Sequence, residues 1–420
     1  MGCGKTQPND DGRFEPRHRS TKSVRFMNEL TDTIWDEELA VLEGQGLKRR
    51  LRDVTGAQGW KIILDGKEVL NFCSNNYLGL ADDPRLREAA IECIKEEGAG
   101  SGASRLICGN MAAHRELEET IARFKGVESC LLFSTGYMAN VGIIASVFGR
   151  DDMIFCDRLN HASIIDGIIL SQAKFKRYPH NDVQALEEML RSAAGFRRRG
   201  IITDSVFSMD GDIAPLAKIV SLAQKYDCLV MIDEAHALGV MGKNGKGLAE
   251  YFGVEERIDI QMGTLSKAAG SFGAYCCGSK GLIDLLVNKA RSFIYTTALP
   301  PAVAAASKKA IEIIRDEPAL RQKLWANTDY FHKAVVAMGL NILSSVTPII
   351  PIVVGESAVA VEFSKRLLEQ GIFVSAIRPP TVPAGTARLR LTVMATHTRE
   401  DLDYTLEKLK VIGEILSLIK

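Results

Sequence analysis

The sequence shows no excess of either charge. Lysine and arginine together number 52, as do aspartate and glutamate, so the formal net charge at pH 7 is zero. Proteins that bind polyanions usually carry a clear basic excess, and we therefore expect no nucleic-acid partner. No apolar run approaches the roughly 18 residues that a membrane helix needs, which argues against a membrane span.

The sequence also lacks a disulfide or zinc framework. Its nine cysteines are scattered, form no Cys-x-x-Cys motif and have no histidine at zinc-ligand spacing. We therefore predict reduced thiols and no metal site. The N-terminal residues contain no apolar core of the kind found in secretory signals, and these features together predict a cytoplasmic protein.

Hydrophobic patterning divides the chain into four parts. Residues 1–27 are polar without periodicity and predict a flexible tail, whereas residues 28–70 predict a helix followed by a hairpin. In residues 71–300, short apolar runs alternate with helical segments, which predicts an α/β domain with a mostly parallel sheet covered on both faces. Residues 301–420 mix strands and helices without that alternation and predict a smaller α+β domain. The strands expected in the large sheet are residues 130–133, 153–156, 200–203, 228–232, 258–262 and 273–277.

A motif of nucleic-acid enzymes also occurs in the sequence. Residues 233–236 spell the DEAH box of helicase ATPases and follow an apolar run, as a Walker B acid does. An ATPase also needs a P-loop, and Gly4-Lys5-Thr6 has neither the upstream glycine nor the preceding strand of that motif. We therefore favour a different chemistry for Asp233 and His236.

Polar residues follow several of the predicted strands, where functional groups of a parallel sheet gather. Lys267 lies in a turn of small residues, where partial burial makes its amine neutral more easily and able to form a Schiff base. Asp233 is the type of acid that keeps the ring nitrogen of a pyridine cofactor protonated. Residues 134–137 begin a predicted helix, whose N–H groups and dipole favour a phosphate. We expect surface or helix-capping roles for His114, His180 and His397.

These residues belong to motifs that resemble the α-oxoamine synthases, a family of pyridoxal 5′-phosphate (PLP) enzymes. The resemblance runs from about Leu42 to the C-terminus. It implies the aspartate-aminotransferase fold, fold type I, with a large PLP-binding domain and a smaller C-terminal domain. The five motifs occur in the family's order and are residues 71–80, 160–163, 206–211, 233–236 and 263–267.

The resemblance implies a role for each matched residue near the cofactor. Lys267 would hold PLP and then act as the base at the Cα of the amino acid. Asp233 would pair with the ring nitrogen, His236 would hydrogen-bond the ring hydroxyl, and His161 would stack on the ring and help to protonate the substrate. The further cofactor-binding residues that it implies are Thr135, Gly136, Tyr137, Ser208, Thr264 and Thr297.

Substrate contacts and a subunit interface are implied in the same way. Thr297 would reach the phosphate in the neighbouring subunit, so the resemblance implies a homodimer with shared active sites. Arg390 matches an arginine that binds the amino acid's carboxylate through its forked guanidinium. Asn75 matches a residue that contacts substrate. Arg49 aligns with an arginine near the acyl-substrate entrance, although a solvated helix face explains it equally well.

The family joins an amino acid to an acyl thioester, and two such reactions compete. One condenses L-alanine with pimeloyl-CoA or a pimeloyl carrier protein, giving 8-amino-7-oxononanoate for biotin synthesis. The other condenses glycine with acetyl-CoA, giving 2-amino-3-ketobutyrate. Residues 107–109 and 160–167 favour the glycine reaction, whereas residues 294–301 and 376–392 favour the alanine reaction. We give the second set more weight because the C-terminal segment borders the substrate site in the family, and a serine palmitoyltransferase-like reaction is a more distant third.

Overall fold

The structure is a computed structural model that describes residues 21–44, 47–49 and 51–419. The chain divides into two units, Met1–Asp53 and Val54–Lys420. In the first unit, helix α1 (Thr21–Gly44) begins seven residues before the expected start of the helix. Residues 21–27, which we assigned to the tail, thus lie in the first two turns of α1. The rest of that tail, residues 1–20, lies outside the described residues.

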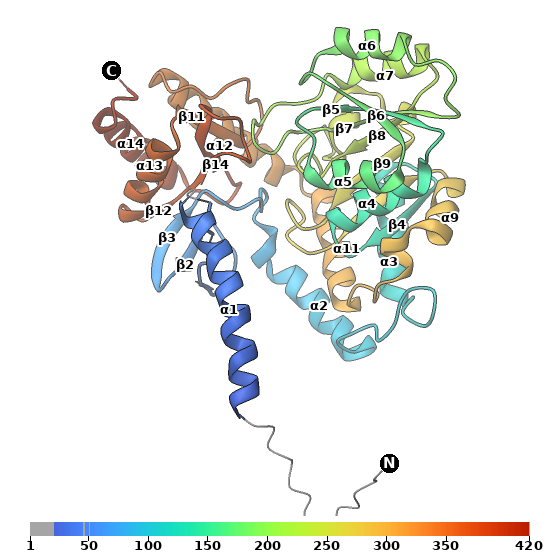
Figure 1. Cartoon of the computed structure of the whole chain (residues 1–420), viewed down its shortest axis with the longest axis horizontal. Coiled ribbons are helices and arrows are strands. Elements are labelled where there is room, and N and C mark those ends of the chain that lie inside the picture. Colours follow the sequence, from blue (N-terminus) through green and yellow to red (C-terminus); the bar gives the residue numbers. More distant parts are fainter. Residues whose placement is uncertain (1–20, 45–46, 50, 420) are drawn as a thin grey trace, which may run out of the picture. The chain divides into compact units, whose positions relative to one another are not determined.

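A seven-stranded sheet forms the centre of the large domain of the second unit (Figure 1). Its strand order is β4-β10-β9-β8-β7-β5-β6, and every neighbouring pair is parallel except the two pairs that involve β10. The prediction of a mostly parallel sheet is therefore confirmed. The strands are β4 (Ser129–Phe133), β5 (Met153–Asp157), β6 (Lys174–Tyr178), β7 (Arg199–Asp204), β8 (Leu229–Asp233), β9 (Ile260–Thr264) and β10 (Ala274–Gly278).

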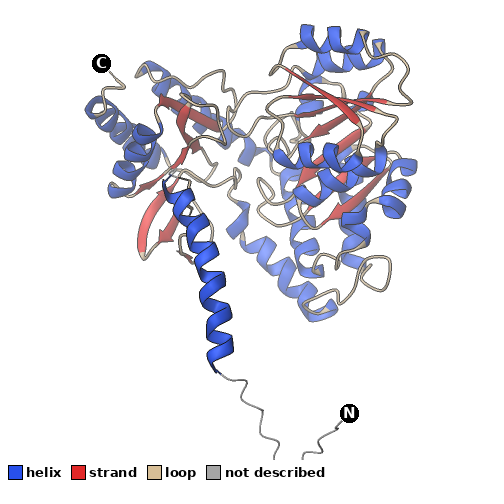
Figure 2. Cartoon of the chain, in the orientation of Figure 1, coloured by secondary structure: helices blue, strands red, loops and turns tan. Residues whose placement is uncertain are grey.

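Helices cover both faces of this sheet, as expected (Figure 2). Successive side chains of a strand point to opposite faces, so Leu131 and Leu132 of β4 belong to two separate apolar clusters. The cluster around Leu131 draws on α4 (Gly136–Val147), α5 (Ala162–Ser171), α9 (Lys280–Lys289) and α10 (Arg291–Ile294). The cluster around Leu132 draws on α2 (Pro84–Glu97), α3 (Ala112–Lys125), α6 (Val183–Arg191), α7 (Leu216–Lys225), α8 (Leu248–Phe252) and α11 (Pro301–Asp316).

The smaller domain contains two sheets and three helices. One sheet has the order β11-β14-β13, and the other has the order β1-β2-β3-β12. The predicted hairpin supplies β2 and β3, with Asp65 and Gly66 at positive φ in its turn. Its second strand pairs in parallel with β12, so the hairpin belongs to the C-terminal domain. The elements are β1 (Val54–Thr55), β2 (Lys61–Leu64), β3 (Lys67–Asn71), β11 (Ile349–Gly355), β12 (Ile372–Phe373), β13 (Ser375–Ile377), β14 (Ala387–Thr392), α12 (Pro318–Ala337), α13 (Ser357–Glu369) and α14 (Arg399–Ile415).

The two domains meet at helices α11 and α12. Helix α11 packs against α2 and α3, and its Ile311 and Ile314 are buried in the core of the large domain. Helix α12 contributes Leu324 to that core but Phe331 to the core of the small domain. We therefore propose a domain boundary within α12, instead of at residue 300. None of the helices formed by the described ranges has the length and apolar character needed to cross a membrane.

A buried ion pair links α3 to the loop after β8. The Lys125 ammonium lies 2.5 Å from Glu234 Oε2, and both side chains are almost fully buried. The other oxygen, Oε1 of Glu234, accepts a hydrogen bond from the backbone N–H of Ala249 at 3.0 Å. Removing one partner of such a pair leaves an uncompensated charge in the interior.

We predict that Lys125→Met lowers the free energy of unfolding by about 3–5 kcal/mol, measured by urea denaturation. The matched control is Lys280→Met, because Lys280 forms an exposed ion pair with Asp284. That control is expected to change stability little, since exposed pairs are hydrated and screened by salt. An equal, small effect of both substitutions would contradict the prediction.

Candidate active site

Six strands of the large sheet end at the same edge. Strands β4, β5, β6, β7, β8 and β9 run in one direction, because β10 is antiparallel to both of its neighbours and the remaining pairs are parallel. Functional groups gather at the carboxyl edge of such a sheet. The predicted residues that follow these strand ends are Thr135, His161, Ser208, Asp233, His236 and Lys267.

Lys267 is a partly buried amine among charged groups. Burial lowers the pKa of Lys267 from 10.5 to about 8, and the positive charge of Arg390 also lowers it. The carboxylates of Asp233 and Asp204 oppose this shift but do not cancel it. Near neutral pH the amine is therefore neutral far more often than that of an ordinary lysine, as a nucleophile or a base requires.

Asp233 is held in place through both of its carboxylate oxygens. It ends β8 with only 4% of its surface exposed. Its Oδ1 accepts a hydrogen bond from the backbone N–H of Ala235, and its Oδ2 accepts one from Asn140 Nδ2, each at 2.8 Å. Its carbonyl oxygen accepts two more, from the N–H and the hydroxyl of Ser205. The carboxylate is thus fixed in orientation at the edge of the sheet.

His236 lies beside Tyr77. Tyr77 belongs to the motif of residues 71–80, but we did not predict it as a site residue. The Nδ1 of His236 is 2.6 Å from the hydroxyl of Tyr77. Burial, reinforced by the charges of Lys267 and Arg390, lowers the pKa of His236 well below its usual range, so the ring is neutral. Burial also raises the pKa of Tyr77 to about 12, which keeps its hydroxyl protonated. The two side chains offer a neutral hydrogen-bonding pair at the site.

His161 caps helix α5 and also faces the site's charges. Its backbone N–H donates to Asp204 Oδ2 at 2.6 Å, and its Nδ1 is 2.8 Å from Ser163 Oγ. Loss of hydrating water around the ring lowers the pKa of His161, and Lys267 lowers it further, against the opposing charge of Asp233. His161 is nevertheless an exposed residue. Its capping role therefore leaves part of its surface accessible.

The structure brings Asn75, Ser208 and Arg390 together. The guanidinium of Arg390, on β14 of the small domain, donates to Asn75 Oδ1 at 3.1 Å and to the carbonyl oxygen of Ser208 at 2.5 Å. It also donates to Thr392 Oγ1 at 3.2 Å. The contact to Ser208 thus uses its backbone. Both domains contribute residues to this cluster.

The residues predicted to bind a phosphate lie at the start of helix α4. Thr135 is the N-cap residue, and its Oγ1 accepts from the N–H of Met138 at 3.1 Å. The first N–H groups of a helix have no partner within it, so those of Gly136 and Tyr137 remain available to an anion. Across the sheet, Thr264 Oγ1 hydrogen-bonds Ser266 Oγ at 2.6 Å. The Tyr137 hydroxyl instead donates to Asp166 Oδ2.

The positions of two predicted residues do not show whether they bind cofactor or substrate. Thr297 is exposed in the segment before α11, and its predicted partner belongs to a second subunit. Arg49 is exposed and belongs to the first unit, Met1–Asp53. Their roles stay predictions.

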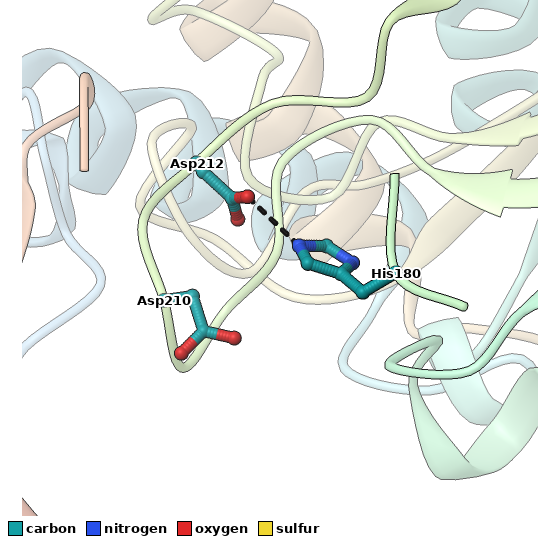
Figure 3. A group of neighbouring side chains, drawn as sticks. All are labelled: His180, Asp210 and Asp212. Atoms are coloured by element: carbon teal, nitrogen blue, oxygen red, sulfur yellow. Dashed lines mark hydrogen bonds and ion pairs between the residues drawn. The ribbon is translucent and has the colours of Figure 1, made fainter. Parts of the chain in front are cut away.

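His180 differs from the expectation of a surface or capping role. Its Nδ1 lies 3.0 Å from Asp157 Oδ1 and its Nε2 lies 2.8 Å from Asp212 Oδ2 (Figure 3). Burial lowers the pKa of His180, but the hydrogen bonds to these two carboxylates outweigh it and raise that pKa to about 10. Asp210 is nearby but pairs with Arg388. The ring is an imidazolium between two acids, which explains the cluster without a metal ion. His114 does cap, since its Nδ1 accepts from the backbone N–H of Met111 at the start of α3. For His397 the expectation is wrong: it is buried and accepts from the N–H of Met394, while Thr398 is the N-cap residue of α14.

The chemistry of these groups fits a phosphorylated pyridine aldehyde. Lys267 offers an amine with a pKa of about 8 for the aldehyde, and the fixed carboxylate of Asp233 can accept from a ring N–H. The N-terminus of α4 offers N–H donors for a phosphate. Each part of the cofactor thus has a partner of suitable type at one edge of the sheet.

Comparisons with known proteins agree with this arrangement. Residues 67–409 match the family model of aminotransferases of class I and II. The chain is 52% identical over 385 residues to the 8-amino-7-oxononanoate synthase of Geobacter sulfurreducens, covering 91% of this chain and 98% of the relative. It is 54% identical over 386 residues to the synthase of the same name from Citrifermentans bemidjiense, covering 91% and 99%.

Solved structures give the same result. A serine palmitoyltransferase from Sphingomonas wittichii has a TM-score of 0.87 at 30% identity, covering 94% of this chain and 99% of that one. A further serine palmitoyltransferase structure, solved with PLP, also has a TM-score of 0.87 at 30% identity, covering 93% and 99%. The 8-amino-7-oxononanoate synthase of Francisella tularensis has a TM-score of 0.72 at 31% identity, covering 83% and 98%.

Proposed function

Since the chain belongs to the class I and II aminotransferase family, we propose that it is a PLP-dependent C-acyltransferase, an α-oxoamine synthase. Its substrates are an amino acid and an acyl thioester. The reaction is the condensation of L-alanine with a pimeloyl thioester to 8-amino-7-oxononanoate, with release of the thiol and CO2. The identity of about half of all residues to synthases of that name, over nine-tenths of the chain, supports this choice of substrates.

The observation that carries the proposal is the meeting of Lys267, Asp233 and Arg390 at one edge of the sheet. Arg390 reaches this edge by donating to the carbonyl oxygen of Ser208, and its positive charge lowers the pKa of Lys267 whereas Asp233 raises it. An amine, an acid and a forked cation are what a PLP enzyme needs for its aldehyde, its ring nitrogen and its substrate's carboxylate.

Bound PLP supplies an electron-withdrawing pyridinium ring that stabilises negative charge at the Cα of the amino acid. Asp233 would accept a hydrogen bond from the ring nitrogen and so keep it protonated. Lys267 Nζ would take the Cα proton of the bound amino acid, which allows Cα to bond to the thioester carbonyl carbon as the thiolate leaves. After the carboxyl group departs as CO2, Lys267, with its lowered pKa, would return a proton to the same carbon.

Thiol release by the purified, PLP-loaded protein tests the proposal. We would compare L-alanine plus pimeloyl-CoA with glycine plus acetyl-CoA, at equal enzyme concentration. Faster release with the first pair supports the proposed reaction. Faster release with the second means that the chain is a glycine C-acetyltransferase, as the resemblance of residues 107–109 and 160–167 suggests.

Arg390→Lys is expected to raise the KM for L-alanine by about 10- to 100-fold, with a smaller change in kcat. Lysine keeps the charge but cannot form two parallel hydrogen bonds to a carboxylate. Initial rates of thiol release at saturating pimeloyl-CoA measure both constants. The control is Arg388→Lys, two residues away on β14, where the arginine pairs with Asp210. A fall in kcat at unchanged KM would contradict a carboxylate-binding role.

Loading of the apoenzyme with PLP is expected to speed up with pH around a midpoint near pH 8. The neutral amine is the nucleophile, and burial of Lys267 lowers its pKa to about 8. The rate of absorbance change on mixing apoenzyme with PLP, measured between about pH 6.5 and pH 10, gives this midpoint. In Asp233→Asn it should move to lower pH, since Asp233 raises the pKa of Lys267. A midpoint near 10.5 would show that the amine is hydrated like a surface lysine.

We further propose that the enzyme is a homodimer whose subunits share their active sites. Exposed Thr297 and Tyr295 in the segment before α11 are the groups we expect a second subunit to cover. Sedimentation should then give a mass of twice 46.0 kDa. A monomer that turns over at full rate would rule out sharing. For the compartment we propose the cytoplasm, which suits nine scattered cysteines without a disulfide framework.

A further inference from the structure

Two buried polar side chains lie between Asp233 and His161. Asn140 interrupts the otherwise apolar middle of α4, and Ser163 lies in the first turn of α5; each exposes only 1% of its surface. Asn140 Nδ2 is 2.8 Å from Asp233 Oδ2 and 2.9 Å from Ser163 Oγ. Ser163 Oγ is in turn 2.8 Å from His161 Nδ1. A continuous chain of hydrogen bonds therefore connects the acid to the exposed imidazole.

The chemistry of each group fixes the direction of these bonds. An ionised carboxylate only accepts, so Asn140 must present its NH₂ group to Asp233. Its second N–H then points to Ser163 Oγ, which accepts. The hydroxyl oxygen could also accept from His161, but the single proton of Ser163 would then lack an acceptor, because among the described residues Asn140 Nδ2 and His161 Nδ1 are the partners of Oγ. Ser163 therefore gives that proton to His161 Nδ1.

A second donor supports the same assignment. The backbone N–H of Ser163 also points at His161 Nδ1, at 3.3 Å. Two donors leave no room for a proton on Nδ1. Because the pKa of His161 is lowered, the neutral ring carries its one proton on Nε2, on the side of the ring away from Ser163.

The arrangement has an energetic cost. Within the described part of the chain, Asn140 Oδ1 is buried and has no hydrogen-bond partner. Turning the amide over would pair that oxygen with the carboxylate of Asp233, which is repulsive. The structure thus leaves a carbonyl unsatisfied, at a cost of about 1–3 kcal/mol, while both N–H groups stay on the chain toward His161.

We propose that Asn140 and Ser163 are positioning residues that fix His161 as the neutral Nε2–H tautomer and tie that choice to the negative charge of Asp233. His161 then presents a proton donor to whatever occupies its free side. The consequence for turnover rests on the proposed function, but the tautomer itself is a property of the protein alone.

The direct test is the ¹⁵N spectrum of the imidazoles in protein labelled at histidine. Seven histidines contribute, and His161→Gln identifies the signal of interest. We expect wild-type His161 to show an unprotonated Nδ1 and a protonated Nε2. Asn140→Ala leaves Ser163 free to reverse its hydroxyl, so both nitrogens should move toward the averaged shifts of a tautomer mixture. Ser163→Ala should do the same, which provides a second variant if one fails to fold.

Two controls remove a buried hydroxyl from the same helices without touching the chain of bonds. Ser146 in α4 donates to the carbonyl oxygen of Gly142, and Ser171 in α5 donates to that of Ile168. Ser146→Ala and Ser171→Ala should leave the shifts of His161 unchanged. A protonated Nδ1 in the wild type, or unchanged shifts in folded Asn140→Ala and Ser163→Ala, would overturn the proposal.

Turnover gives an independent readout. Asn140→Ala and Ser163→Ala should each lower kcat by about tenfold, and the double variant should lose no more than either alone, because both break one chain. Multiplicative losses would mean that the two residues act separately and would count against the proposal. A wild type that releases no thiol from either substrate pair would reject the proposed function and leave the ¹⁵N result to decide the tautomer.

Discussion

Replacement of Lys267 by alanine is expected to abolish thiol release and to remove the visible absorbance of the Schiff base. The amine is needed twice, as the attachment point of PLP and as the base at Cα, and no described residue of this edge offers a second amine with the same lowered pKa. Loss of a positioned base alone costs about 10²- to 10⁴-fold in rate. We therefore expect kcat to fall by at least about 10³-fold, measured by thiol release with L-alanine and pimeloyl-CoA.

Lys280→Ala is the matched control, because that lysine is exposed at the start of α9. It should retain wild-type turnover and the wild-type spectrum. Adding a primary amine such as methylamine to Lys267→Ala should restore a small part of the rate if the missing group is the base. Appreciable turnover by Lys267→Ala without added amine would show that Lys267 is not the catalytic lysine.

The second large effect is expected from Asp233→Asn. Asparagine has nearly the same shape, and its oxygen can still accept from the N–H of Ala235 or from Asn140. It lacks the negative charge that keeps the ring nitrogen protonated. Since preorganised charge of this kind contributes about 10²- to 10³-fold, we expect kcat to fall by that factor while the KM for L-alanine changes little.

Asp259→Asn provides the comparison, because Asp259 is an exposed acid just before β9 whose Oδ2 accepts from the N–H of Val230 of β8, away from the site. It should keep wild-type kcat. A second measurement, the rate of Cα-proton exchange of L-alanine in D₂O without thioester, separates ring chemistry from acyl transfer. If Asp233→Asn exchanges that proton at the wild-type rate, the charge of Asp233 does not act on the ring.

Much of the fold could be predicted because buried parallel strands are continuous apolar runs. The six predicted strands coincide with structural ones to within two residues at each end. Strand β6 was missed since its sequence, Lys-Phe-Lys-Arg-Tyr, is polar; it lies at the sheet's edge and leaves most of its side chains exposed. In the C-terminal part, residues 301–337 form two helices, α11 and α12, and Pro318 at the start of α12 is a signal that we did not use.

The site could be predicted less completely, for a physical reason. Groups that touch a cofactor lie in motifs of unusual residue types, as Lys267 and Asp233 do. Groups that hold those residues are ordinary by type and are recognised only when the fold brings them together. Lys125 and Glu234 are 109 residues apart and Asn140 and Asp233 are 93 apart. The sequence indicates Asn140 in one way, as a polar amide in an otherwise apolar helix. That position predicts a buried hydrogen bond but does not identify the partner.

The pairing of β3 with β12 has a consequence for how the chain is made. Cys73, just after β3, hydrogen-bonds the carbonyl oxygen of Phe373, 300 residues later. At about 5–20 residues per second, a ribosome takes roughly 15–60 s to synthesise the intervening chain. During that time the edge of the hairpin has no partner, while the large domain can already fold. The sheet of the small domain is therefore completed only after synthesis is nearly finished. Until then the hairpin edge is unpaired, and we expect a chaperone to bind there.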